Sequence, residues 1–126
     1  TNLGTWAARN MRGSDRLSVH ATGRAADLGW KDPTIAALWA NWLVANYEIL
    51  GIEELHDYAG VTKKGCEKWG RGWRCNRNGK PGWKDWTETA NGGTPGGHWL
   101  HVELTPEMAD NPRTFVKAWK TLTKPI

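Results

Sequence analysis

The chain has few cysteines, few phenyl or phenol rings and no long hydrophobic run. Its 126 residues contain two cysteines, two tyrosines and one phenylalanine, whereas tryptophan occurs ten times. No apolar stretch is long enough to span a bilayer and no charged-then-apolar leader opens the chain, so nothing predicts membrane insertion or a signal peptide. The length predicts a single domain over residues 1–126. A first residue Thr1 in place of methionine is compatible with a domain excised from a longer, multidomain protein.

The two cysteines, Cys66 and Cys75, lie in a segment rich in glycine and tryptophan. Their spacing does not match a paired-thiolate zinc finger. We favour a disulfide that clamps this segment, which would indicate an oxidising compartment, over a reduced intracellular pair.

Acidic residues are too few to balance the basic ones, and the formal net charge is +4. The excess lies mainly between residues 63 and 84, where the basic residues are Lys63, Lys64, Lys68, Arg71, Arg74, Arg77, Lys80 and Lys84. A polyanion or an acidic surface is one neighbour that this charge would suit. Solvated loop charges are the simpler interpretation.

The hydrophobic pattern predicts an α+β fold with a small, mostly antiparallel sheet flanked by helices. Asp32-Pro33 is a strong helix start, because aspartate caps the helix and proline suits its first position. An apolar stripe up to Leu50, followed by Gly51, predicts that this helix covers residues 33–50. The other expected elements are a helix over 3–11, extended segments over 16–20 and 24–28, strands over 52–58 and 99–104, and a last helix that begins at Asn111-Pro112.

Residues 60–97 show no sustained periodicity and hold much of the glycine of the chain. We expect one long, structured Gly/Trp-rich loop here, because its tryptophans argue against disorder. Its rings (Trp69, Trp73, Trp83 and Trp86) are expected to form a small satellite core, with one or two of them at the functional site. The tryptophans on helical stripes are expected to pack in the core; these are Trp6, Trp39, Trp42 and Trp119.

Two imidazoles and one carboxylate from distant segments form the most informative pattern. They are His20 and Asp27 near the start and His101 near the end. A catalytic zinc ion takes three protein ligands of these types and leaves one position for water, whose pKa then falls to about 7. The combination predicts an open zinc site of a hydrolase.

The motif Ser-x-His-x-x-Gly-Arg-Ala-x-Asp over residues 18–27, followed late in the chain by a His101-Val102 strand, resembles one zinc peptidase family. This family comprises D-alanyl-D-alanine carboxypeptidases, phage endolysin peptidases and the hedgehog signalling domain. The resemblance implies one zinc ion held by His20, Asp27 and His101, a small sheet flanked by helices, and hydrolysis of peptidoglycan stem peptides.

The family usually places Glu or Asp three residues before the last ligand as general base, and this chain has His98 there. We favour His98 as the base or oxyanion stabiliser, since a neutral imidazole accepts a proton at pH 7. Gly96-Gly97 would allow the backbone to turn His98 toward the metal. Two alternatives stay open: Glu103, on the strand face of His101, is the base, or His98 is a fourth ligand that makes the site structural.

Other residues near the motifs have two interpretations each. Ser18 contacts the substrate in the family, or it bonds to the backbone. Arg24 binds a substrate carboxylate, or it has a structural partner, which we rank slightly higher. Trp99 stands where relatives often carry a second histidine and is expected to line the site. His56 is expected to be a structural histidine.

The leading functional prediction is a monomeric zinc metallopeptidase of the endolysin type, from a bacteriophage or a bacterium. It would cleave a peptide bond in peptidoglycan and act at the cell wall, either secreted, periplasmic or released by a phage holin. A DD-carboxypeptidase and a zinc-stabilised, non-catalytic module that binds cell wall or glycan are the alternatives. Nucleic-acid binding through the basic, Trp-rich loop has poor motif support.

Overall fold

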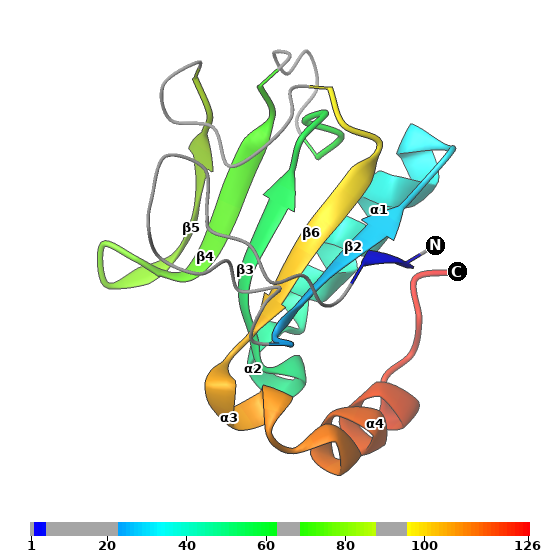
Figure 1. Cartoon of the computed structure of the whole chain (residues 1–126), viewed down its shortest axis with the longest axis vertical. Coiled ribbons are helices and arrows are strands. Elements are labelled where there is room, and N and C mark those ends of the chain that lie inside the picture. Colours follow the sequence, from blue (N-terminus) through cyan, green and yellow to red (C-terminus); the bar gives the residue numbers. More distant parts are fainter. Residues whose placement is uncertain (1, 5–22, 63–68, 88–95) are drawn as a thin grey trace.

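The computed structural model describes residues 2–4, 23–62, 69–87 and 96–126 of the chain. Within them, six strands form one antiparallel sheet in the order β1-β2-β6-β3-β4-β5 (Figure 1). The strands are β1 (Asn2–Gly4), β2 (Ala25–Gly29), β3 (Ile52–Asp57), β4 (Arg71–Arg77), β5 (Lys80–Asp85) and β6 (Trp99–Leu104). The helices are α1 (Pro33–Ala45), α2 (Tyr47–Leu50), α3 (Pro106–Ala109) and α4 (Pro112–Thr121).

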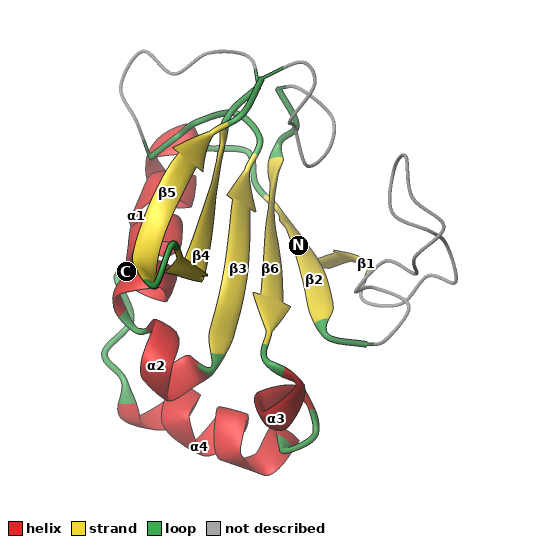
Figure 2. Ribbon diagram, turned by 90° about the vertical axis from the view of Figure 1, so that its left-hand side faces the viewer, coloured by secondary structure: helices red, strands yellow, loops and turns green. Residues whose placement is uncertain are grey.

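The predicted α+β class is confirmed, with helices that flank the sheet on one face and at one end. Helix α1 runs along one face, and α2, α3 and α4 gather at the end of the sheet where β6 finishes (Figure 1, Figure 2). The helix α1 begins as predicted: the Asp32 side chain accepts a hydrogen bond from the Thr34 backbone N–H at 2.8 Å, and Pro33 follows the cap. The helical stretch is interrupted at Asn46 and ends at Gly51, whose φ of 67° is the left-handed conformation that favours glycine.

The two faces of the sheet differ sharply in polarity because side chains alternate along each strand. Leu55, Leu100 and Val102 face α1 and belong to the main core, in which Leu55 is fully buried. Burial of one such side chain contributes about 1.5–3 kcal/mol to folding. The opposite face carries His56 and His101, which lie directly across from each other in the β3–β6 ladder. We call this second face the polar face.

Trp42 and Trp119 pack against the main core as predicted, whereas Trp6 lies outside the described residues. The rings of Trp39 and Trp119 stack with centroids 5.9 Å apart, and Trp42 meets Trp119 edge-on at 5.3 Å. These contacts join α1 to α4. The Trp42 indole N–H also donates to the Thr123 carbonyl at 2.7 Å, which ties the C-terminal segment to α1.

The prediction of one long loop over residues 60–97 is wrong, since residues 71–85 form a β-hairpin of β4 and β5. Asn78-Gly79 connects these strands with φ values of 54° and 90°. Positive φ at both central residues is the property of the turn that joins two antiparallel strands most tightly. Trp73 lies in the main core, 2% exposed, rather than in a satellite core. Trp83 packs against that same core.

Several expected features fall at or outside the limits of the described residues. Leu3 and Gly4 lie in β1, not in a helix; the rest of the expected 3–11 helix and the extended segment 16–20 lie outside the described residues. Cys75 is a free cysteine, and Cys66, its expected disulfide partner, also lies outside. None of the described helices is long and apolar enough to cross a membrane.

Candidate functional site

The structure brings together two of the three predicted zinc ligands. Asp27 on β2 and His101 on β6 are register partners in the antiparallel ladder, and both side chains lie on the polar face. The His101 Nδ1 atom is 2.9 Å from Asp27 Oδ1, although the two residues are 74 positions apart in the sequence. Both side chains are largely buried, with 8% and 18% of their surface exposed. The strand pairing therefore places an imidazole nitrogen against a carboxylate oxygen.

A second carboxylate holds the other side of the same ring. The Glu103 Oε1 atom lies 2.8 Å from His101 Nε2, because residues 101 and 103 alternate onto the same face of β6. Burial alone would lower the pKa of His101, but hydrogen bonds and charges from Asp27 and Glu103 raise it to about 9. The site thus favours positive charge at this imidazole.

This donor set fits part of a zinc site. Neutral imidazole and carboxylate are zinc ligands, and a ligating histidine characteristically donates its other ring N–H to a carboxylate, as His101 Nε2 does to Glu103. His20, the third predicted ligand, and Ser18 lie outside the described residues. Among the residues that are described, no group of three or more histidine, cysteine, aspartate or glutamate side chains is arranged to hold a metal ion.

The structure does not place His98 at this site, so the prediction that it is the base is not supported. Its ring is exposed and stacks on Trp30, with centroids 4.9 Å apart, on the α1 face. The Trp30 N–H donates to the His98 carbonyl at 2.9 Å, so the β2–β6 ladder continues past Trp99 and imposes strand alternation on His98. The conformational freedom of Gly96 and Gly97 does not turn the His98 side chain to the polar face. The same geometry speaks against His98 as a fourth ligand.

His56 on β3 is a member of the polar face for which the sequence predicted only a structural role. Its ring centroid is 5.2 Å from that of His101. The His56 Nε2 atom lies 2.9 Å from Glu54 Oε1, and its Nδ1 atom lies 3.4 Å from the Tyr58 hydroxyl. The alternation Glu54-x-His56-x-Tyr58 was the available signal in the sequence, since it puts three polar groups on one strand face.

The charge of Glu54 is stabilised within this group. Burial tends to raise the pKa of Glu54, but the hydrogen bond and charge of His56 and the charge of Arg74 overcome it and lower this pKa to about 2. The Arg74 Nη2 atom is 3.6 Å from Glu54 Oε2. Glu54 and Glu103 are register partners in the β3–β6 ladder, which places the His56 group beside the His101 group.

The two remaining predicted substrate residues have different surroundings. The Arg24 guanidinium donates to Glu53 Oε2 and to the Leu104 carbonyl, both at 2.9 Å. These contacts match the structural alternative for Arg24 rather than substrate binding. Trp99 lies on the polar face and packs against Tyr58, with ring centroids 5.2 Å apart.

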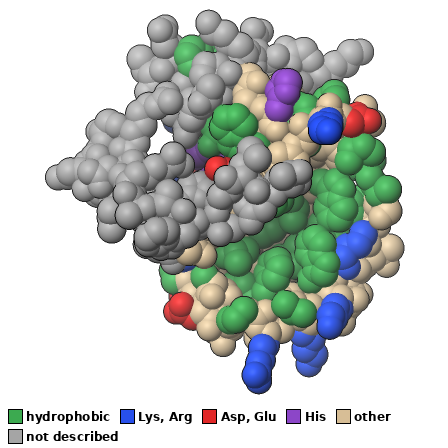
Figure 3. Space-filling view, turned by 45° about the vertical axis from the view of Figure 1, so that its right-hand side comes forward, with side chains coloured by type: hydrophobic (Ala, Val, Ile, Leu, Met, Phe, Trp, Pro, Cys, Tyr) green, Lys and Arg blue, Asp and Glu red, His purple; other side chains and the backbone are tan. Residues whose placement is uncertain are grey.

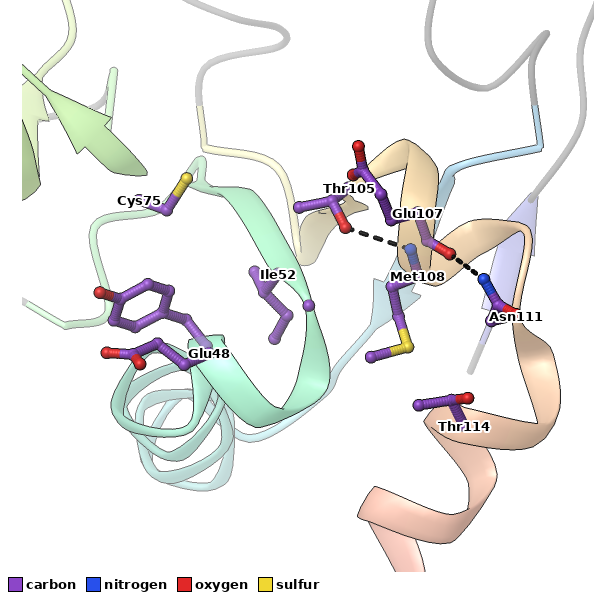
Figure 4. Close-up of a pocket in the computed structure, with 10 residues that line it drawn as sticks. Glu48, Ile52, Cys75, Thr105, Glu107, Met108, Asn111 and Thr114 are labelled. Atoms are coloured by element: carbon purple, nitrogen blue, oxygen red, sulfur yellow. Dashed lines mark hydrogen bonds between the residues drawn. The ribbon is translucent and has the colours of Figure 1, made fainter.

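Two cavities lie away from these groups. An apolar groove of about 680 Å³ runs between β2, β6, α1 and α4, and Figure 3 shows hydrophobic side chains gathered around this hollow. A smaller cavity, of about 360 Å³, lies between α2, α3 and β4 (Figure 4). There the Thr105 hydroxyl accepts a hydrogen bond from the Met108 N–H at 3.2 Å and caps α3. Neither cavity contains the imidazole–carboxylate groups of the polar face.

Comparisons with protein-family models, with curated proteins and with solved structures found no match to this chain.

Proposed function

We propose that this protein is a zinc-dependent endopeptidase that cleaves a peptide bond in bacterial peptidoglycan. The observation that carries the proposal is the contact between Asp27 and His101. These residues come from two motifs that resemble a zinc peptidase family, and strand pairing puts their ligating atoms 2.9 Å apart on one buried face.

Each described residue of the site has a role in this proposal. Asp27 and His101 Nδ1 would hold the metal together with His20, the third ligand implied by the resemblance. Glu103 accepts the Nε2 proton of His101, so Nδ1 would be the nitrogen that binds zinc once the ion replaces the proton between Nδ1 and Asp27. A bound zinc ion supplies an activated water and polarises the scissile carbonyl.

Proton transfer in this proposal falls to the polar face rather than to His98. His56 has the arrangement of a base with its orienting group, because Glu54 fixes its Nε2 and leaves Nδ1 as the acceptor. The Tyr58 hydroxyl, 3.4 Å from that Nδ1 atom, faces the same nitrogen. Glu103 is already engaged with His101, which makes it a positioning residue.

The test is digestion of purified peptidoglycan by the protein with and without a chelator, followed by mass analysis of the fragments. We expect zinc-dependent release of fragments cut inside the stem peptide or cross-bridge, and no release by Asp27→Asn. Loss of only a terminal D-alanine would identify a carboxypeptidase instead. Release that persists in chelator, or no release from any peptidoglycan with zinc present, would overturn the proposal.

A further inference from the structure

The polar face continues from His56 to Trp86, whose indole packs against the hairpin at Gly72. The ring centroids of His56 and Trp86 are 5.3 Å apart. Gly72 leaves the space for this ring: a Cβ atom at position 72 would lie 2.1 Å from Trp86 Cζ2. The backbone N–H of Trp86 also donates to the Gly70 carbonyl at 3.0 Å, which fixes the backbone at this point. Because Gly72 has no side chain, the indole of Trp86 can pack beside the site.

Two cations flank this indole. The Arg77 guanidinium carbon and the Lys84 Nζ atom each lie 5.9 Å from the ring centroid, within the range of cation–π attraction. Arg77 is held by the carbonyls of Gly82, at 3.3 Å, and Gly72, at 3.4 Å. Neither cation forms an ion pair with a carboxylate in the described part of the chain. The polar face therefore has imidazoles and carboxylates on β2, β6 and β3, and the positive charges of Arg77 and Lys84 on β4 and β5.

The separation between these two regions suits a short peptide. Strand β4 lies two strands from β6 in the sheet. Neighbouring strands are about 4.8 Å apart, so the distance across the face is roughly 10 Å, which an extended peptide covers in about three residues. The rings of His101, His56 and Trp86 form a continuous row along this path.

We infer that Trp86, Arg77 and Lys84 form a subsite for a carboxylate of the substrate, a few residues from the bond that is cut. This inference rests on the proposed function and specifies its substrate class as acidic stem peptides. The remaining guanidinium donors of Arg77 and the ammonium of Lys84 bind the carboxylate, and the indole supports the aliphatic part of the same residue. A peptide in which this carboxylate is amidated loses both charge-assisted contacts.

The experiment is calorimetric titration of the zinc-loaded protein with two synthetic stem tetrapeptides. The two differ only in a carboxylate or carboxamide at the glutamyl residue, and both carry an N-methylated scissile amide so that they are not consumed. We expect the acid to bind about tenfold more tightly than the amide at low salt. In the double variant Arg77→Gln/Lys84→Gln this ratio should fall to near one. The variant Lys117→Gln, on the exposed surface of α4, should keep the tenfold ratio.

A second variant tests whether the position of the Trp86 indole matters, without changing the charge of the subsite. Gly72→Ala displaces Trp86 and should weaken binding of the acid, with unchanged far-UV circular dichroism as the check on folding. An acid-to-amide ratio of one in the wild type, or a ratio that survives the double substitution, would overturn the subsite. Equal or tighter binding of a single-stranded oligonucleotide at the same residues would overturn it as well.

The failure of the subsite and that of the proposed function are distinguishable. Hydrolysis of peptidoglycan without acid-to-amide discrimination removes the subsite and leaves the peptidase. Discrimination without hydrolysis in the presence of zinc removes the peptidase and leaves a peptide-binding face.

Discussion

His101 is fixed at both ring nitrogens before any ligand is considered. Asp27 contacts Nδ1 and Glu103 contacts Nε2, each within 2.9 Å. An imidazole held in this way has one orientation, and in the proposed zinc site Nδ1 would exchange its proton for the metal while Nε2 keeps its contact with Glu103. In the proposed site Glu103 would therefore act on the metal through His101, without contact to the metal itself.

This role predicts the effect of Glu103→Ala. Zinc affinity should fall about 10- to 100-fold, because the His101 ring loses the acceptor that orients it. Competition with a chromophoric chelator measures the affinity. Glu103→Gln, whose carbonyl oxygen still accepts the Nε2 proton, should stay close to the wild type. Glu107→Ala on exposed α3 is the matched control, and an unchanged affinity in Glu103→Ala would contradict the role.

The lowered pKa of Glu54 predicts how stability depends on pH. A carboxyl group with a pKa of about 2 in the folded protein and about 4.5 unfolded contributes stability above pH 4.5. This contribution, on the order of 3 kcal/mol, is lost as pH falls from about 4.5 to about 2. Urea denaturation should show the wild type more stable than Glu54→Gln at pH 6.5, with the difference shrinking through that window. A constant difference would refute the assignment.

At the residue scale, the motifs predicted that Asp27 and His101 meet, but not what surrounds them. Asp27 and His101 follow from local motifs. His56 does not, because its neighbourhood depends on the pairing of β3 with β6, which no local pattern determines. His98 lies away from the polar face because the β2–β6 ladder extends one residue pair beyond the strand ends. The hydrogen bonds of this ladder, rather than Gly96 and Gly97, determine the direction of the His98 side chain.

At the scale of elements, the hairpin β4–β5 shows how a short turn organises a glycine-rich segment. Asn78-Gly79 is a strong hairpin signal. The hairpin was nevertheless not predicted, because the flanking strands carry too many glycines and charges to show clear alternation of apolar and polar residues. The helices were predicted well where capping chemistry is local, as at Asp32-Pro33 and Gly51. Helix α3 was not predicted, because a helix of a single turn is too short to show a periodic pattern of apolar residues.

The turn predicts a specific cost for Gly79→Ala. Gly79 has a φ of 90°, and a Cβ there would meet no atom within 4 Å, so the whole penalty is conformational. The free energy of unfolding should fall by about 1–2 kcal/mol, as measured by urea denaturation. Gly82→Ala is the matched control, since its Cβ would meet only Arg77 at 3.8 Å or more, and it should cost less than 0.5 kcal/mol, roughly the limit for surface substitutions. Equal losses in both variants would contradict the turn assignment.

At the scale of the whole molecule, the proposed metal site couples to global stability. An ion that binds the folded state alone stabilises it by about 2.7 kcal/mol at a hundred times its Kd. Zinc should therefore raise the melting temperature of the wild type, measured by calorimetry with and without chelator, and Asp27→Asn should abolish most of this rise. An equal rise in both proteins would place the zinc elsewhere.

The pairing of β2 with β6 also governs when the site comes into existence. It joins residues 74 positions apart, so most of the chain must be ordered before Asp27 meets His101. At ordinary rates of translation the two residues leave the ribosome roughly 4–15 s apart. The N-terminal half of the chain alone cannot form the contact between Asp27 and His101, because it does not contain His101. In the proposed zinc site, the metal would consequently bind only to the finished fold, because partly synthesised chains lack the paired Asp27 and His101 side chains.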